Sequence, residues 1–116
     1  MPTILAVDNE RPILALISEI LRAEHTVITA ESGTEALALY ASYSSQIDLL
    51  LTDVEMPGMS GPELVARLGK LFVRPLPIIF VTGGPGLDLE ASQTVVRKPF
   101  SPSVLKETIK RALQGA

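Results

Sequence analysis

Residues 47–61 read IDLLLTDVEMPGMSG, and the first six of them are the most apolar strand candidate in the chain. A short run rich in Leu and Ile predicts a buried β-strand over 47–52 that ends on Asp53. Residues 56–61 consist of Met, Pro, Gly and Ser, which is the composition of a loop. The stretch therefore predicts a buried strand that carries an aspartate to the start of a loop.

Short apolar runs on both sides of this stretch alternate with segments of helical periodicity. The other predicted strands cover residues 3–7, 26–30, 76–81 and 94–96. Repeated strand–helix units predict an α/β fold with a doubly wound, five-stranded parallel sheet. In such sheets the functional crevice lies at the carboxyl ends of the strands, near the point where the strand order reverses.

Apolar residues at helical spacing predict at least four helices, three between strands and one after the last strand. The positions that define the first three helices are Ile13, Leu14, Ile17, Ile20 and Leu21, then Ala36, Leu37 and Tyr40, then Leu64, Val65, Leu68 and Phe72. The last helix is expected to open at Ser101 and Pro102 and to carry Val104, Leu105, Ile109 and Leu113 inward.

Length and composition restrict the classes of protein that the chain can belong to. Its 116 residues are expected to form one domain, 1–116, without an output domain. A net charge of −3 gives no basic surface for nucleic acid or anionic lipid, and the absence of cysteine excludes disulfides and thiolate metal sites. Neither a signal peptide nor an apolar run near the roughly 20 residues of a membrane span is present. We expect a cytoplasmic protein that binds neither nucleic acid nor membrane.

Polar residues follow four of the predicted strands and should meet at one edge of the sheet. They are Asp8-Asn9-Glu10, Asp53, Thr82 and Lys98. An ionised aspartate is an oxygen nucleophile at neutral pH, and a divalent cation offsets the charge of an incoming phosphoryl group. Oxygen ligands from Asp8, Asn9, Asp53 and a backbone carbonyl suit Mg²⁺. Lys98 and Thr82 could contact phosphoryl oxygens, so the set suits phosphoryl transfer.

Four segments, taken in order, resemble the motifs of the response-regulator receiver domain of two-component signalling. They are TILAVDNE at 3–10, DVEMPGMSG at 53–61, VTG at 81–83 and KPF at 98–100. The resemblance implies a flavodoxin-like sheet of order 2-1-3-4-5. It also implies that Asp53 accepts a phosphoryl group from a histidine kinase or phosphotransfer protein.

The same resemblance implies a role for each residue at this edge. Asp8, Asn9 and Asp53 would hold Mg²⁺ together with the backbone carbonyl of Glu55. Thr82 would move toward the phosphoryl group and Lys98 would pair with it. The peptide bond between Lys98 and Pro99 is expected to be cis.

Three features depart from the family pattern. Asn9 stands where the family has a second acid, which predicts weaker Mg²⁺ binding unless Glu10 compensates. Val95 stands where the family has an aromatic residue that switches inward. Residues 83–93 are too few and too rich in Gly and Pro for a full helix, so the family's fourth helix is expected to be truncated or replaced by a loop.

Other functions fit parts of the sequence. A pseudo-receiver that binds partners without phosphorylation would explain the three departures. An aspartate-nucleophile phosphatase of the haloacid-dehalogenase type also has an acid two residues after its nucleophile, as Asp53 and Glu55 do, but its nucleophile follows the first strand and is backed by a cap. A flavin-binding protein would need a Ser/Thr-rich loop after the first strand, which is missing.

Overall fold

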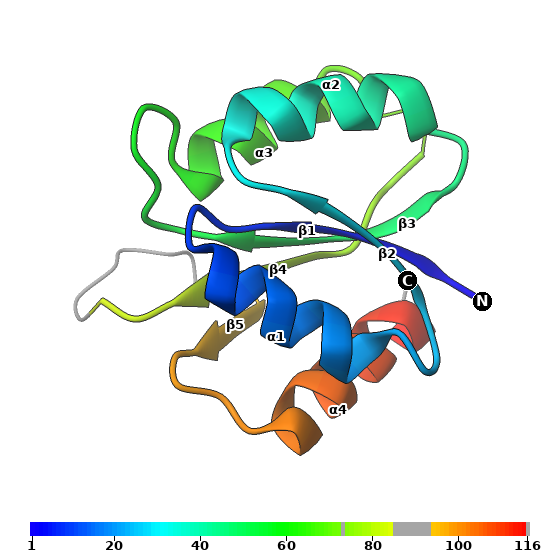
Figure 1. Cartoon of the computed structure of the whole chain (residues 1–116). Helices are drawn as coiled ribbons and strands as arrows, with labels where there is room; N and C mark the ends of the chain where they lie inside the picture. The colour runs from blue at the N-terminus through cyan, green and yellow to red at the C-terminus, as the bar shows by residue number, and fades with distance from the viewer. Residues whose placement is uncertain (73, 85–93, 116) are drawn as a thin grey trace.

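A single parallel sheet forms the centre of the molecule. The computed structural model describes residues 1–72, 74–84 and 94–115. The strands are β1 (Thr3–Val7), β2 (Thr26–Ala30), β3 (Ile47–Asp53), β4 (Ile78–Thr82) and β5 (Thr94–Arg97), and they lie in the order β2-β1-β3-β4-β5 (Figure 1). Every neighbouring pair is parallel. The predicted doubly wound sheet and its order are therefore confirmed.

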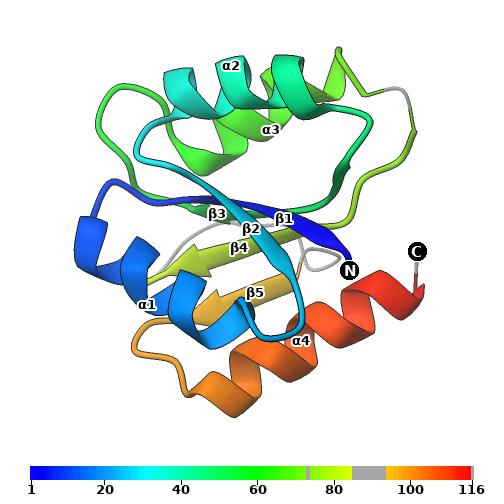
Figure 2. The same ribbon diagram turned by 45° about the vertical axis from the view of Figure 1, so that its right-hand side comes forward.

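Among the described elements, two helices cover each face of the sheet (Figure 2). Helices α1 (Arg11–Leu21) and α4 (Pro102–Gly115) lie on one face, and α2 (Gly33–Tyr43) and α3 (Gly61–Gly69) lie on the other. None of the described helices is long and apolar enough to cross a membrane. The expected shortening of a helix within 83–93 remains a prediction, because residues 85–93 lie outside the described part of the chain.

The core consists of two aliphatic layers separated by the sheet. Along β1, Ile4 and Ala6 face α1 and α4, whereas Leu5 and Val7 face α2 and α3. All five residues of this strand are buried, as expected for the centre of a parallel sheet covered on both faces. Asp8 directly follows β1, and Asp53 is the last residue of β3, so both acids lie at the ends of strands that are buried between the two helical layers.

Three sequence expectations need correction. Phe72 packs against the core but lies after α3, which ends at Gly69. The fourth strand begins at Ile78 rather than at 76, because Pro77 has no N–H to donate to the ladder; its carbonyl accepts from the Leu50 amide instead. Val104 does not point inward: it is 51% exposed, whereas Leu105 is fully buried. Consecutive helical residues are turned by roughly 100°, so Val104 faces outward when Leu105 and Ile109 face the core.

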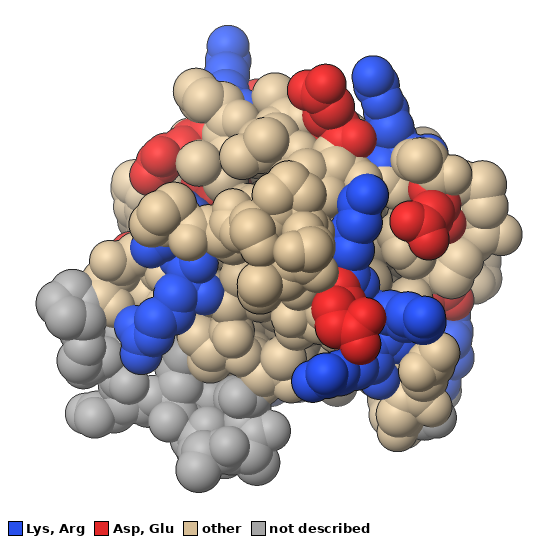
Figure 3. Space-filling model, turned by 90° about the horizontal axis from the view of Figure 1, so that it is seen from below, with Lys and Arg blue, Asp and Glu red and all other residues tan. Residues whose placement is uncertain are grey.

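The surface on the side of α1 and α4 carries charges of both signs. Lys and Arg side chains lie next to Asp and Glu around an uncharged central area (Figure 3). One such pair joins Arg111 to Glu107 along α4, with 3.2 Å between Nε and Oε1. Charges of both signs are therefore mixed on this face of the molecule.

Candidate functional site

The strand register brings the predicted polar residues to one edge of the sheet. Val7 is level with Thr52, and Asp53 is level with Val81, so Asp8, Asp53 and Thr82 follow one another across three adjacent strands. β1 and β3 are neighbours although β2 lies between them in the chain, and this is the point where the strand order reverses. Lys98 follows β5 directly, and its amide donates to the Thr82 carbonyl.

The buried Asp8 and Asp53 and the half-buried Lys98 form a group that we call the acidic cluster. The Lys98 Nζ lies 2.9 Å from Oδ2 of Asp8 and 3.4 Å from Oδ2 of Asp53. Asp8 is 1% exposed and Asp53 is 3% exposed. Two carboxylates thus share one ammonium group, which leaves the acidic cluster with an excess of negative charge at neutral pH.

Each carboxylate of the acidic cluster has a second oxygen in a different situation. Oδ1 of Asp8 accepts a hydrogen bond of 2.9 Å from the amide of Glu10. Oδ1 of Asp53 is buried and has no hydrogen-bond partner among the described residues. Because a buried polar atom without a partner is costly, such an atom is often found where a ligand binds.

The surroundings shift the pKa values of Asp53 and Lys98. Burial raises the pKa of Asp53 to about 6, the nearby Asp8 charge acts in the same direction, and Lys98 offsets them only in part. Burial alone would lower the pKa of Lys98, but the hydrogen bond and charge of Asp8 outweigh it and the pKa is raised. At neutral pH Lys98 is therefore protonated and most of Asp53 is ionised.

The acidic cluster fits a hard divalent cation. It offers carboxylate oxygens, an excess negative charge and the unpartnered Oδ1 of Asp53, which is what Mg²⁺ requires. The described residues contain no group of three or more His, Cys, Asp or Glu side chains placed to hold a metal. The further ligands expected from the sequence, the side chain of Asn9 and the backbone carbonyl of Glu55, are neutral oxygens. Asn9 lies next to Asp8 and is exposed.

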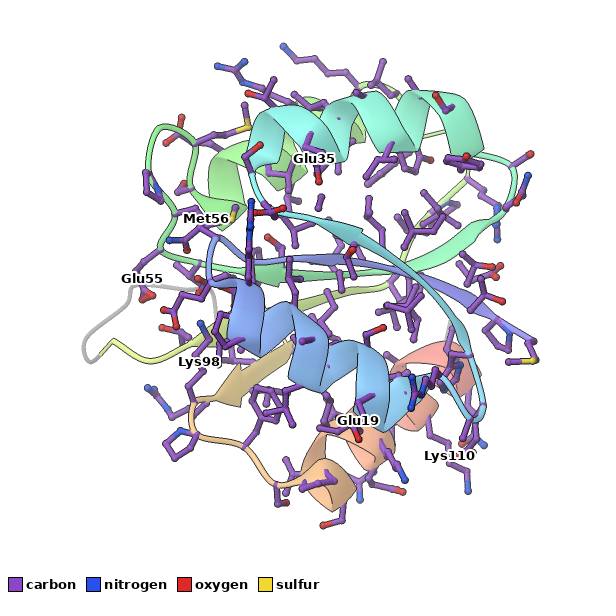
Figure 4. The ribbon with its side chains drawn as sticks, in the orientation of Figure 1. Glu19, Glu35, Glu55, Met56, Lys98 and Lys110 are labelled. Carbon is purple, nitrogen blue, oxygen red and sulfur yellow. The ribbon has the colours of Figure 1, made fainter. Side chains whose placement is uncertain are left out.

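The hydroxyl of Thr82 lies at the same edge but is bonded elsewhere. It donates to Oε1 of Glu55 over 2.7 Å and accepts from the amide of Gly84 over 3.1 Å. Thr82 is 1% exposed, whereas Glu55 is exposed. The side chains of Glu55 and Lys98 both project from this edge of the sheet (Figure 4). The receiver motif implied a role only for the backbone carbonyl of Glu55, and the bond from Thr82 to its side chain was not predicted from the sequence.

The loop after β3 is held close to Asp53 by backbone contacts. Gly61 donates its amide to the carbonyl of Val54, and a Cβ on Gly61 would collide with the carbonyl oxygen of Asp53. Gly58 has a φ of 81°, a conformation that favours glycine. The peptide bond between Lys98 and Pro99 is cis, as the family resemblance implied.

Comparison with known proteins places this architecture in one family. The sequence model of the response regulator receiver domain matches residues 4–110. The chain is 34% identical to the chemotaxis protein CheY of Pseudomonas aeruginosa, covering 96% of this chain and 95% of that protein. It is 35% identical to a probable cyclic di-GMP phosphodiesterase of Vibrio cholerae, but spans only 27% of that protein's length.

Solved structures agree with the sequence matches. A response regulator receiver domain protein from Clostridium thermocellum has a TM-score of 0.89 and 29% identity, covering 99% of this chain and 96% of the other. The receiver domain of the hybrid histidine kinase CckA has a TM-score of 0.84 and 33% identity, covering 97% and 99%. This chain belongs to the response regulator receiver domain family, whose members are signalling domains of two-component systems.

Proposed function

We propose that this domain is a phosphoacceptor switch, in which Asp53 takes a phosphoryl group from a phosphohistidine of a histidine kinase or phosphotransfer protein. The observation that carries the proposal is the state of Asp53: it is buried, close to Lys98, and one of its oxygens has no partner among the described residues. Receiver domains work with such kinases and phosphotransfer proteins, which supports the choice of donor.

The proposed reaction is a transfer between two nucleophiles. A carboxylate oxygen of Asp53 forms a bond to phosphorus while the bond from phosphorus to the donor's imidazole nitrogen breaks. The nitrogen keeps the electron pair and takes up a proton from solvent, and Asp53 becomes an acyl phosphate. Most of the catalysis is positioning and charge compensation, because the protein has little covalent chemistry to perform in such a transfer.

Each neighbour of Asp53 has a proposed part in this reaction. Lys98 is protonated and close enough to pair with a phosphoryl oxygen after the transfer. The hydroxyl of Thr82 would donate a hydrogen bond to another phosphoryl oxygen. Mg²⁺, held by Asp8, Asn9, Asp53 and the carbonyl of Glu55, would offset the negative charge that both reactants bring. We place this activity in the cytoplasm, on the basis of the family.

Intact-mass measurement after incubation with acetyl phosphate and Mg²⁺ tests the proposal. We expect one phosphoryl adduct on the wild-type protein and none on Asp53→Asn. Asp48→Asn, a matched change at the opposite end of β3, should keep the adduct. The absence of an adduct on the wild type would favour a pseudo-receiver, and rapid repeated turnover of a phosphate ester would favour a phosphatase.

A further inference from the structure

The hydroxyl of Thr82 cannot serve two acceptors at once. A threonine hydroxyl has one proton to donate, and here that proton goes to the Glu55 carboxylate over 2.7 Å. The amide of Gly84 donates to the hydroxyl oxygen of Thr82 and helps to fix the orientation of that hydroxyl. If Thr82 is to donate to a phosphoryl group on Asp53, as proposed above, its bond to Glu55 must first break.

Glu55 is placed so that it can hold this hydroxyl and also release it. Its partner is buried, but Glu55 itself is exposed, so its carboxylate can swing into water without losing packing. Gly84 makes room for it: a Cβ at that position would lie 2.8 Å from Oε1 of Glu55. The clash would be with the far end of a flexible side chain, so even a methyl group at residue 84 would push the carboxylate away.

Electrostatics gives the direction of this motion. The charge of Glu55 already disfavours the ionised form of Asp53, in addition to the larger effects of burial and Asp8. An acyl phosphate on Asp53 carries more negative charge than the carboxylate it replaces, so its repulsion of Glu55 is stronger. Phosphorylation therefore weakens the bond between Glu55 and Thr82 at the moment when Thr82 acquires a new acceptor.

We infer that Glu55 is a positioning residue that acts through Thr82: it holds the hydroxyl in the resting orientation and is expelled when Asp53 is phosphorylated. The inference rests on the proposed function and adds a restraint to it. In the unphosphorylated state the hydrogen bond to Glu55 restricts the Thr82 hydroxyl to one orientation. It thereby opposes reorientation of Thr82 before Asp53 is phosphorylated. It also places a like charge in the path of an anionic phosphoryl donor.

Three variants separate the hydrogen bond from the charge. Glu55→Ala removes both, and Glu55→Gln removes the charge but keeps an acceptor oxygen. Gly84→Ala displaces the carboxylate without changing Glu55. Glu19→Ala, an exposed acid on α1 (Figure 4), is the control for charge, and Gly69→Ala, where a Cβ meets nothing within 4 Å, is the control for Gly84→Ala.

The decisive measurement is the NMR position of the Thr82 methyl group in unphosphorylated protein. In Glu55→Ala and Gly84→Ala we expect it to move toward its position in the phosphorylated wild type, and less so in Glu55→Gln. Both controls should match the wild type. Phosphorylation by acetyl phosphate should be about 5-fold faster in Glu55→Ala and Glu55→Gln, since one partly screened like charge is removed.

The outcomes distinguish this inference from the proposed function. Identical Thr82 methyl positions in the wild type and Glu55→Ala, in protein that still acquires the adduct on Asp53, would overturn the role of Glu55 alone. A wild type that acquires no adduct would overturn the proposed function itself.

Discussion

Two parts of the same sheet edge differ in how far their polar groups are already satisfied. In the acidic cluster of Asp8, Asp53 and Lys98, two carboxylates share one cation and an oxygen of Asp53 is unpartnered among the described residues. Next to it, the hydroxyl of Thr82 both donates and accepts a hydrogen bond. The acidic cluster lacks positive charge, whereas the hydroxyl of Thr82 already has both a hydrogen-bond acceptor and a donor.

If the domain is the phosphoacceptor switch proposed above, this difference separates two requirements of its function. The acidic cluster would bind the ligand, so it must be left with unmet charge in the free protein. The pair of Thr82 and Glu55 would respond to that ligand, so it must be stable until the ligand arrives. A site in which both parts were satisfied would not react, and one in which both were unsatisfied would have no defined resting state.

The largest effect should come from breaking the acidic cluster at its only cation. Lys98→Met keeps the length of the side chain but leaves Asp8 and Asp53 buried without compensation, which should lower the free energy of unfolding by about 3 kcal/mol. Urea denaturation at neutral pH measures the loss, and saturating Mg²⁺ should recover part of it. Lys110→Met, at an exposed position of α4 (Figure 4), is the control.

An unchanged denaturation midpoint for Lys98→Met would mean that the two carboxylates do not depend on Lys98. The pair of Thr82 and Glu55 would then be the stronger part of the edge, which is the reverse of the comparison above. A loss that Mg²⁺ does not reduce would contradict the cation site in the acidic cluster.

Asp53→Asn should have a smaller effect of opposite sign, because it removes one of two competing carboxylates. The pKa of Asp53 is about 6 in the folded protein and near 4 when unfolded, so the folded state keeps its proton to higher pH. Stability therefore falls as pH rises from about 4 to 6, and the full cost is present above pH 6. The variant should be more stable by about 1–3 kcal/mol at neutral pH without Mg²⁺.

Thermal or urea unfolding of Asp53→Asn across this pH range checks the sign. Near pH 3 the wild type and the variant should be equally stable, because Asp53 is then protonated in both the folded and unfolded states. A variant less stable than the wild type at neutral pH would show that the attraction between Asp53 and Lys98 exceeds the combined cost of burial and repulsion by Asp8.

The sheet and the members of the acidic cluster were accessible from sequence because they follow from local patterns. Apolar runs mark buried strands, Asp8 and Asp53 directly follow such runs, and Lys98 directly follows β5. The strand order itself came from the family resemblance, since alternating strands and helices allow more than one order. The prediction for Val104 failed because an apolar side chain does not fix the phase of a helix, which Leu105 and Ile109 set by being buried.

The hydrogen bond between Thr82 and Glu55 could not be predicted from the sequence. The two residues are 27 positions apart, and their contact depends on the side-chain rotamer of a loop residue and on the space left by Gly84. No periodicity or composition encodes such a contact. Family motifs indicate the residues that carry the shared chemistry. They do not indicate a hydrogen-bond partner that is particular to one chain.

The smallest effect should come from adding charge to the acidic cluster rather than removing it. Asn9 is exposed beside Asp8, and Asn9→Asp would supply a third carboxylate to a cation there. We expect Mg²⁺ to bind about 10-fold more tightly, as one additional partly screened charge implies. Calorimetric titration measures this affinity directly.

The control is Gln46→Glu, which adds the same charge just before β3, at the opposite end of the sheet, and should leave the affinity unchanged. Equal affinities of Asn9→Asp and the wild type would mean that Glu10 already supplies the missing charge; Mg²⁺ binding by the double variant Asn9→Asp, Glu10→Gln would then equal that of the wild type as well.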